Sequence, residues 1–482
     1  MHQETEKRIF AFYPPGAQFQ RSEDRCQASI DDSLTVTQRA CNDLGYIAAI
    51  SRQAGYTAYI KDYPSEGLNL TDLITDLKNI KPDIVIISVT NATLQNDADI
   101  CLKIKQILPK TIIILKGAIF SALLNTEIEL LKPYIQAVDY AIKGEIEAVL
   151  KELLILLKNN AINEISKLAG IIFKDANGVW QTPKKIALVE NLDALPFPAR
   201  DLMNNKLYIR PDTGKPMATI ESSRGCPAKC IYCLTPVISG NTTRFRSPEN
   251  LIAEIDECVY KYNITDFFFR ADTFTINKQW TLKVCDYIKN RNYKINWVAN
   301  ARVKPIDYET LKSMADSGCW LVAFGIETGS NETLKKLKKG ATRADAEAAI
   351  AAAKKAGLKI YAFFMFGFPW ETEKDILETI DFAYKLDCDF NEFHLATAFK
   401  GTELYEQLPD KKEIIGKNYF SNPNNINPNL SVERLLELRK LAIKKLYLRP
   451  SYILKKLFGI RSFYQFTAYC KYGLKTLKST LK

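Results

Sequence analysis

Histidine is almost absent from this 482-residue chain, which contains only His2 and His394. A metal centre built mainly from histidines is therefore not expected. The sequence also lacks an uninterrupted apolar run of about eighteen residues, so we predict no transmembrane helix. The first residues show no pattern of a secretory signal, and this predicts a reducing cytoplasm in which the cysteines stay free thiols.

Residues 1–430 have no net charge. The whole sequence has a formal charge of +11, and residues 431–482 alone hold 13 Lys and Arg against 2 Asp and Glu. The cations alternate with Tyr, Phe and Leu, which predicts a basic amphipathic helical tail. Three readings of the tail stay open: a helical hairpin packed on the preceding domain, a segment that lies on an anionic membrane, and an RNA-binding segment whose aromatic rings stack on bases.

The motif that carries chemistry is a trio of cysteines, Cys226, Cys230 and Cys233, spaced as C-x3-C-x2-C. Iron–sulfur clusters usually take four cysteines, so three thiolates on one loop predict a [4Fe–4S] cluster with one iron left open for a ligand. A zinc knuckle and buried structural thiols are the alternatives. Zinc sites usually need a second cysteine pair or histidines, and the neighbouring sequence offers neither.

The N-terminal region alternates short apolar strands with helices. Because such alternation is typical of a doubly wound parallel sheet, ligands are expected beyond the carboxyl ends of its strands. The expected strands cover residues 8–15, where the strand ends in a turn, and residues 57–62, 83–89, 111–115 and 138–142. The loops after the last three strands carry the candidate binding residues Ser88, Thr90, Asn91, Gly117, Gly144 and Glu145.

The region that contains the cysteines repeats this alternation. Six strand-like segments between residues 216 and 408 predict a partial (β/α)6 barrel, with the cysteine loop after its first strand. Polar residues follow several of these strands, where a zwitterionic ligand with a ribose would find donors and acceptors. Ordinary capping of loops is the alternative role. The residues concerned are Asp272, Asn300, Arg302 and Glu327.

The cysteine motif, with Tyr232 before its last cysteine, resembles the signature of the radical S-adenosylmethionine (radical SAM) enzymes. A doubly wound domain directly ahead of it, over about residues 8–158, resembles the cobalamin-binding domain of the cobalamin-binding radical SAM family. A degenerate Rossmann-like domain that binds another nucleotide and a purely structural domain are the alternatives. The span 216–408 is similar to the subgroup of the anaerobic magnesium-protoporphyrin cyclase and the hopanoid-pathway radical SAM proteins. In place of the consecutive aspartates of that subgroup, this chain has Arg270 and Ala271, which leaves the substrate open.

This resemblance implies three cofactors: a [4Fe–4S] cluster, SAM and cobalamin. It implies that Tyr232 lies beside the adenine of SAM, that Asn300 and Glu327 contact its ribose and methionyl parts, and that Asp272 approaches its amino group. Arg302 is a further candidate for this site. The Asp-x-His-x-x-Gly motif of cobalamin mutases is absent, so no histidine of this domain is expected to bind cobalt.

Taken together, the sequence predicts a cobalamin-dependent radical SAM enzyme that acts on an unactivated carbon by methyl transfer, ring closure or oxidation. The expected substrate is a lipid, a tetrapyrrole or a natural-product intermediate, and a low-potential electron donor is needed; nucleic acid is not expected. Two alternatives are an RNA-modifying methylthiotransferase and a non-enzymatic iron–sulfur electron carrier.

The expected organisation has four parts. They are a cobalamin-binding domain at 1–160, a linker with a small hairpin at 161–215, a radical SAM barrel at 216–430 and the basic tail at 431–482. The expected location is the cytoplasm, where the tail would allow peripheral contact with the inner face of the membrane.

Overall fold

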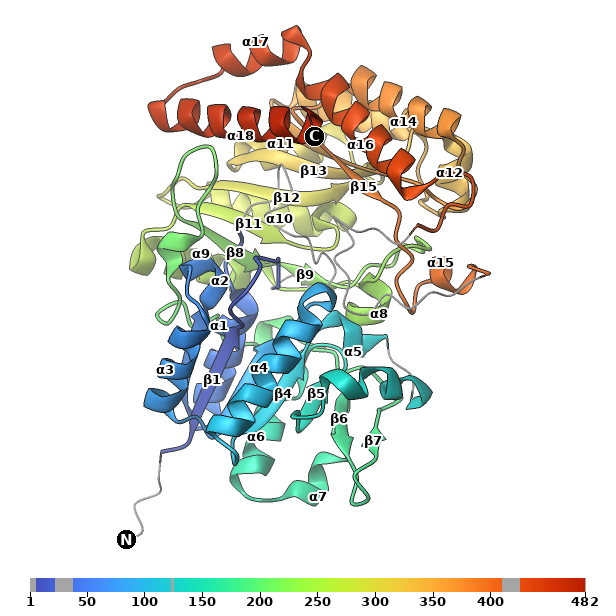
Figure 1. Cartoon of the computed structure of the whole chain (residues 1–482). Coiled ribbons are helices and arrows are strands. Elements are labelled where there is room, and N and C mark those ends of the chain that lie inside the picture. The colour runs from blue at the N-terminus through green and yellow to red at the C-terminus, as the bar shows by residue number, and fades with distance from the viewer. Residues whose placement is uncertain (1–5, 22–37, 123–124, 410–424, 482) are drawn as a thin grey trace.

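The computed structural model describes residues 6–21, 38–122, 125–409 and 425–481, and it contains two large sheets, each flanked by helices (Figure 1). The first sheet has the strand order β2-β1-β3-β4-β5-β6-β7. Its strands are β1 (Arg8–Tyr13), β2 (Thr57–Asp62), β3 (Ile84–Ser88), β4 (Ile112–Lys116), β5 (Tyr140–Ile142), β6 (Ile171–Lys174) and β7 (Trp180–Gln181).

Strands β1 to β5 run parallel, and the order of the chain reverses between β1 and β3. Such a switch point is where doubly wound sheets bind ligands. The helices that accompany this sheet are α1 (Asn42–Gln53), α2 (Tyr63–Glu66), α3 (Leu70–Ile80), η1 (Asn91–Thr93), α4 (Leu94–Ile107), α5 (Ala118–Ser121), η2 (Asn125–Tyr134), η3 (Ile146–Ala148), α6 (Leu150–Lys158) and α7 (Ile162–Ile165). The predicted doubly wound α/β fold is confirmed.

The hairpin expected between the two domains forms β6 and β7. These strands pair antiparallel with β5 and with each other, so they extend the first sheet. Residues 182–216, called the crossing segment below, lead from β7 to the second sheet and contain the short turns η4 (Leu192–Ala194) and η5 (Asn205–Leu207).

The second sheet has six parallel strands in the order β15-β14-β13-β12-β11-β8. Strands that follow one another in the chain are neighbours in space, as repeated βα units require. The strands are β8 (Met217–Glu221), β11 (Asp266–Arg270), β12 (Asn296–Arg302), β13 (Cys319–Glu327), β14 (Lys359–Phe366) and β15 (Phe390–Leu395).

Helices between these strands cover the outer face of the second sheet. They are α9 (Pro248–Tyr262), α10 (Lys278–Lys289), α11 (Tyr308–Asp316), α12 (Asn331–Lys336), α13 (Arg343–Lys355) and α14 (Glu373–Leu386). Ser247 and Pro248 begin α9 as its N-cap and first residue, the positions at which serine and proline are favoured. The shorter elements are β9 (Ser223–Arg224), α8 (Thr235–Ser239), β10 (Arg244–Phe245), η6 (Phe274–Ile276) and α15 (Glu403–Glu406).

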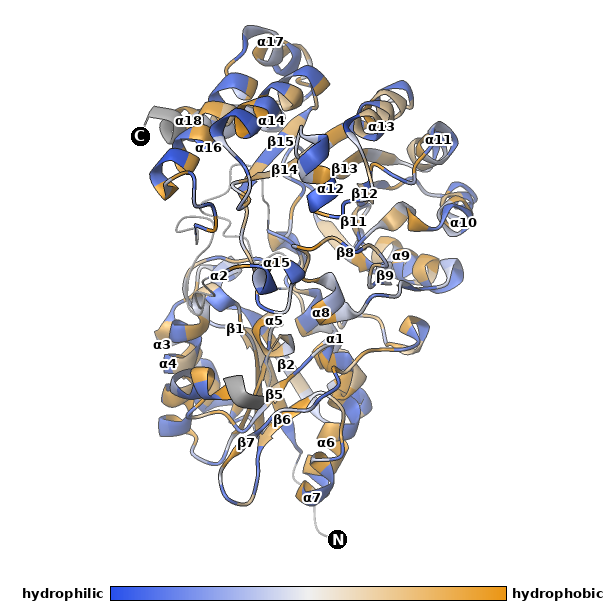
Figure 2. Cartoon of the chain, turned by 90° about the vertical axis from the view of Figure 1, so that its right-hand side faces the viewer, coloured by the Kyte–Doolittle hydropathy of each residue, from blue (hydrophilic) through white to orange (hydrophobic). Residues whose placement is uncertain are grey.

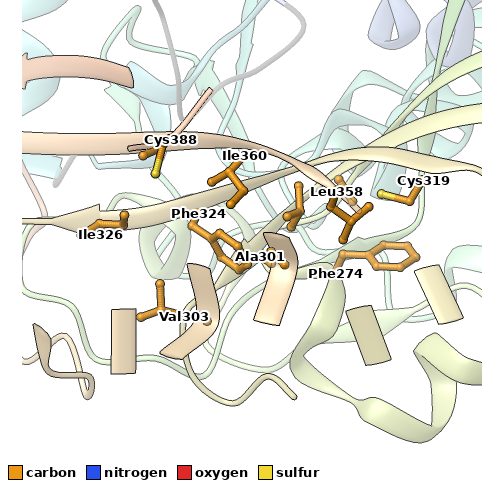
Figure 3. Close-up of a cluster of buried hydrophobic side chains, with 14 of the residues drawn as sticks. Phe274, Ala301, Val303, Cys319, Phe324, Ile326, Leu358, Ile360 and Cys388 are labelled. Carbon is orange, nitrogen blue, oxygen red and sulfur yellow. The ribbon is translucent and has the colours of Figure 1, made fainter. Parts of the chain in front are cut away.

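One continuous hydrophobic core lies between the second sheet and its helices (Figure 3). Phe324 and Ile326 of β13 and Ile360 of β14 point into it. Along each strand the alternate residues point to the opposite, inner face, because successive side chains of a strand alternate. Figure 2 shows helices that carry both hydrophilic and hydrophobic residues, as expected for helices with one face on a sheet.

The C-terminal tail is helical, with α16 (Val432–Tyr447), α17 (Pro450–Phe458) and α18 (Phe463–Leu481). Helix α16 belongs to the core, because its residues Leu435, Leu438, Ala442 and Leu446 are buried against the second sheet and its helices. Among the helices of the described residues, none is long and apolar enough to cross a membrane.

Candidate active site at the junction of the two sheets

The carboxyl ends of strands from both sheets line one cleft. Lys116 ends β4, Glu145 and Glu147 follow β5, and Glu221 and Arg270 end β8 and β11. The open volume of this cleft, solvent included, is about 570 Å³. Each domain therefore presents the edge at which α/β proteins bind ligands, and the two edges lie opposite each other.

The cysteine loop lies at this junction, after β9, and a glycine fixes its path. Gly225 has φ +84°, and a Cβ at this position would lie 2.2 Å from the carbonyl oxygen of Thr242. Its amide donates to Oδ2 of Asp272 at 2.7 Å, and the hydroxyl of Thr235 donates to Oδ1 at 3.0 Å. Asp272 therefore joins the start of the loop to the helix that follows it.

Donors from other elements lie close to the three sulfur atoms. Nη1 of Arg302 is 3.4 Å from Sγ of Cys230, and the amide of Thr235 is 3.4 Å from Sγ of Cys233. The third sulfur, in Cys226, lies 3.9 Å from the hydroxyl of Thr273. Within the described ranges no three His, Cys, Asp or Glu side chains are grouped around a single-ion site. The donor set, three thiols on one loop, fits a cluster in which each thiolate binds a different iron.

Three of the residues predicted for SAM come together beside the cysteines. Nζ of Lys339 lies 2.5 Å from Oε1 of Glu327 and 3.5 Å from the hydroxyl of Tyr232, and Arg302 donates to the carbonyl of Lys339. Glu327, at the end of β13, has φ +71°, an unusual backbone conformation for a residue with a side chain. Burial and the Glu327 carboxylate raise the pKa of Tyr232.

Lys339 was missed by the sequence reasoning. It follows another lysine in an exposed-looking Lys-Lys-Gly stretch, and nothing in that stretch signals that its side chain is 5% exposed. The other two predicted SAM residues have different settings. Asn300 points to the inner face of the barrel sheet, next to Arg302 on β12, whereas Asp272 is engaged by the cysteine loop.

The residues predicted for cobalamin divide into two groups. Ser88 lies at the end of β3 and donates to Oδ2 of Asp43 at 2.8 Å, while Thr90 and Asn91 begin the turn η1 behind it. The second group, Gly117, Gly144 and Glu145, contacts neighbouring segments of the chain. A Cβ on Gly117 would lie 2.6 Å from the carbonyl of Val89.

Gly144 and Glu145 hold the barrel region and the crossing segment against the first sheet. A Cβ on Gly144 would lie 2.3 Å from the carbonyl of Ala187. The Glu145 carboxylate accepts from the Arg244 guanidinium at 2.7 and 2.8 Å and from the amide of Val189 at 2.8 Å. Glu145 therefore joins the first domain to the cysteine-loop region.

Asp43, at the start of α1, is the centre of a buried network that the sequence did not reveal. Its carboxylate accepts from the hydroxyl of Tyr13, from Ser88, and from Nζ of Lys116 at 3.0 Å. These groups come from α1, β1, β3 and β4, so one carboxylate gathers the ends of three strands at the switch point. Asp43 and the strand ends are far apart in sequence, and no local motif announces their contact.

Fold and cysteine loop together define the class: a protein with a doubly wound domain set against a radical SAM barrel. The model of the radical SAM superfamily matches residues 220–383. An uncharacterized methyltransferase of Pyrococcus horikoshii is 31% identical over 425 residues, which are 87% of this chain and 90% of the relative. The chain therefore belongs to the radical SAM superfamily, and it is a radical SAM enzyme.

Two further similarities cover both domains. The anaerobic magnesium-protoporphyrin IX monomethyl ester cyclase of Cereibacter sphaeroides is 24% identical over 398 residues, which are 81% of this chain and 63% of the cyclase. The solved structure of the radical SAM methyltransferase TsrM from Kitasatospora setae, with cobalamin and a [4Fe–4S] cluster bound, has a TM-score of 0.68 at 16% identity. That match covers 93% of this chain and 90% of TsrM and supports the two-domain fold.

Proposed function

We propose that this chain uses a [4Fe–4S] cluster on Cys226, Cys230 and Cys233 to cleave SAM, and that its first domain holds cobalamin against the same site. The observation that carries the proposal is the position of the three thiols. They lie near the carboxyl ends of one parallel sheet, and the carboxyl ends of the other sheet lie across the cleft. In the solved TsrM structure, whose fold is similar over both domains, cobalamin and a [4Fe–4S] cluster are bound.

The side chains around the thiols suit this chemistry. Arg302 and the amide of Thr235 donate toward two of the sulfurs and would stabilise the negative charge of a thiolate-bound cluster. Lys339 offers a cation for the carboxylate of SAM, and Glu327 and Asn300 offer acceptors for its amino group and ribose. Tyr232, packed beside Phe368 with the ring centroids 6.3 Å apart, would flank the adenine. When bound, the cluster would supply the electron that cleaves SAM to a 5′-deoxyadenosyl radical, and cobalamin would supply a methyl group.

The cobalamin site that we propose lies at the carboxyl ends of β1, β3 and β4, around Asp43 and Lys116. Of the two histidines, His394 lies on β15 of the other sheet and His2 lies outside the described residues. We therefore propose that cobalt has no imidazole ligand from this domain. Electron paramagnetic resonance of the Co(II) form should lack coupling to a protein imidazole nitrogen, and finding such coupling would contradict this site.

Analysis of the anaerobically purified protein tests the proposed function directly. We expect about four irons, with matching sulfide, and one cobalamin per chain, and formation of 5′-deoxyadenosine when SAM and a strong reductant are added. A methylthiotransferase would contain a second cluster and no cobalt. An electron carrier would contain iron but would not cleave SAM. Absence of both cobalt and SAM cleavage after reconstitution would overturn the proposal.

The reaction that we propose is methyl transfer to, or ring closure or oxidation at, an unactivated carbon of a lipid, a tetrapyrrole or a natural-product intermediate, with a low-potential electron donor. Relatives named as methyltransferases and as a magnesium-protoporphyrin IX monomethyl ester cyclase support this range. The inner face of the barrel sheet, above which the cysteines lie, is the expected chamber for the substrate.

A second proposal concerns the tail: its last two helices rest on an anionic membrane surface. Helix α16 is packed into the core, but Phe458 and Phe463, at the turn between α17 and α18, are 87% and 81% exposed. Basic residues such as Lys455 and Arg461 lie beside them. Exposed aromatic rings among cations are typical of helices that lie at a bilayer interface, where each Lys or Arg contributes about 1 kcal/mol.

Vesicle flotation tests the tail proposal. The full chain should float with phosphatidylserine-rich vesicles at low salt, and much less with phosphatidylcholine alone, because the attraction is electrostatic and screened by salt. Phe458→Ser with Phe463→Ser should reduce flotation strongly. The matched control is Ile162→Ser, an exposed apolar residue at the far end of the first domain, 59% exposed. If the double variant floats like the wild type, the tail is only a structural cap.

A further inference from the structure

The turn that follows β14, residues 367–371, packs against one side of the proposed SAM site. The buried ring of Phe368 in this turn lies 6.3 Å from the ring of Tyr232, measured between the centroids. Gly367 begins the turn with φ +89°, a conformation that glycine adopts without strain. A displacement of this turn would therefore displace the surface against which Tyr232 packs.

Asn427, far along the chain, contacts the backbone of this turn. Its side chain is buried, and the residue is 3% exposed. Nδ2 of Asn427 donates to the carbonyl oxygen of Phe368 at 2.7 Å and to that of Glu371 at 2.9 Å. Both hydrogens of the side-chain amide are therefore bound to the turn, one at each end of its Phe368–Glu371 part.

The oxygen of the same amide binds the segment to which Asn427 belongs, residues 425–430. Oδ1 of Asn427 accepts from the amide of Asn429 at 2.8 Å and from the amide of Leu430 at 3.0 Å. Nδ2 of Asn429 adds a weaker bond to the carbonyl of Glu371 at 3.1 Å. The Asn427 side chain thus makes all four hydrogen bonds that an amide can make, and it joins the two segments.

Apolar contacts connect the same parts of the molecule. Ile426, Phe368 and Ile231 belong to one buried hydrophobic cluster, and Tyr232 packs against it. Ile231 lies between the second and third cysteines of the loop. The 425–430 segment therefore belongs to the packed layer that supports the cysteine loop and Tyr232, although it lies beyond residues 220–383, which match the radical SAM model.

We propose that Asn427 is a positioning residue for SAM. Its two bonds to the carbonyls of Phe368 and Glu371 fix the 367–371 turn, and the turn fixes Tyr232 beside the adenine. This inference rests on the proposed function in one respect, because it takes Tyr232 as the neighbour of the adenine. A residue that acts in this way affects the nucleoside part of SAM and not its amino-acid part.

SAM binding to the oxidised holoprotein tests the proposal in the Asn427→Asp variant. Aspartate keeps the acceptor for the amides of Asn429 and Leu430, but it places a carboxylate against the two carbonyls of the turn. The dissociation constant for SAM, measured by equilibrium dialysis at pH 8, should rise about tenfold or more, because a carboxylate cannot donate to these carbonyls and repels them. The dissociation constant for methionine, which has no nucleoside, and the iron content should stay unchanged.

The matched control is Asn425→Asp, the same substitution two residues earlier. Nδ2 of Asn425 donates to the carbonyl of Leu430 at 2.7 Å, inside the 425–430 segment, so this variant should bind SAM like the wild type. Normal SAM binding by Asn427→Asp would overturn the proposal. Equal losses in the two variants, or equal losses for SAM and methionine, would overturn it as well, because the segment would then be a general support.

Hydrogen exchange of the wild-type holoprotein gives an independent test if Asn427→Asp does not fold. SAM should slow exchange in peptides from the 367–371 turn and also from the 425–430 segment, because the two are joined through Asn427. Protection that does not extend to the 425–430 segment would overturn the proposal. SAM binding without cleavage would overturn only the proposed function, and cleavage with normal SAM binding by Asn427→Asp would overturn only the role of Asn427.

Discussion

The two sheets present their carboxyl ends to each other, but the residues at these ends are of different kinds. The barrel side has one loop with three cysteines in a fixed spacing, as a cluster in which each thiolate binds one iron would require. The first domain has no comparable motif, and its strand ends carry groups that bind one another, as Asp43 does with Tyr13, Ser88 and Lys116. The site that we propose for a cluster leaves a motif in the sequence, whereas the surface that we propose for cobalamin becomes visible only in three dimensions.

The largest expected effect is the loss of iron and of SAM cleavage when the cysteine loop of the barrel is changed. Replacing Cys226, Cys230 and Cys233 by Ala should remove the iron and reduce 5′-deoxyadenosine formation to the level without protein, since no other thiolate of the described chain lies on that loop. Cys470→Ala, which changes an exposed free cysteine, should leave both unchanged. A triple variant that still bound a full cluster would show that the cluster does not depend on this loop.

The next largest effect is expected where the two domains meet. Glu145→Gln would leave the Arg244 guanidinium, whose side chain is 11% exposed, without its carboxylate, whereas Arg224 would keep its pair with Glu147 at 2.8 Å. Breaking a buried ion pair by removal of one partner typically costs about 3–5 kcal/mol. Denaturant unfolding should show a loss of this size, while the iron bound to the folded protein stays unchanged. A loss of iron without a loss of stability would instead make Glu145 part of the cofactor site.

A pH-dependent effect of intermediate size is expected at the turn after β14. Burial raises the pKa of Glu371 to about 7, although the amides of Gly367 and Phe368 donate to its carboxylate. The folded state therefore holds a proton that the unfolded state releases near pH 4.5, and stability falls as the pH rises from about 4.5 to 7, by on the order of 3 kcal/mol.

The Glu371→Gln variant separates this contribution from the other titrating groups. It should match the wild type near pH 4.5 and be the more stable of the two at pH 8, as measured by denaturant unfolding at both values. Equal stability of the two proteins at pH 8 would show that Glu371 ionises in the folded state without cost.

The smallest effect is expected at an exposed contact between the first domain and the crossing segment. Arg52 and Asp201 form an ion pair at 2.8 Å, and both side chains are 43% exposed. Exposed pairs contribute about 0–1 kcal/mol, so Asp201→Asn should change the free energy of unfolding by less than 1 kcal/mol. A larger loss, on the scale of the Glu145 variant, would remove the distinction between buried and exposed contacts of the two domains.

The sequence predicted the parts of the fold that follow from local pattern. Apolar strands alternating with helices predicted the parallel strands of both sheets. It could not predict Lys339 or Asp43, because their roles depend on contacts with residues distant in the chain. The sequence could not tell the tail helices apart for the same reason. The residue patterns of α16 and α17 are similar, and only their packing shows that α16 is buried and α17 is exposed.

A buried arginine in the crossing segment limits which barrels the first domain can be joined to. Arg200 pairs with Glu254 of α9 at 2.5 Å and donates to the carbonyl of Thr219, to which Asn42 of α1 also donates, each at 2.9 Å. Any barrel has a backbone carbonyl at the position of Thr219. Only a barrel with an acidic residue at the position of Glu254 can neutralise the charge of Arg200. A chimera that joins this first domain to a foreign barrel should therefore fold only if the arginine and its carboxylate are transferred together.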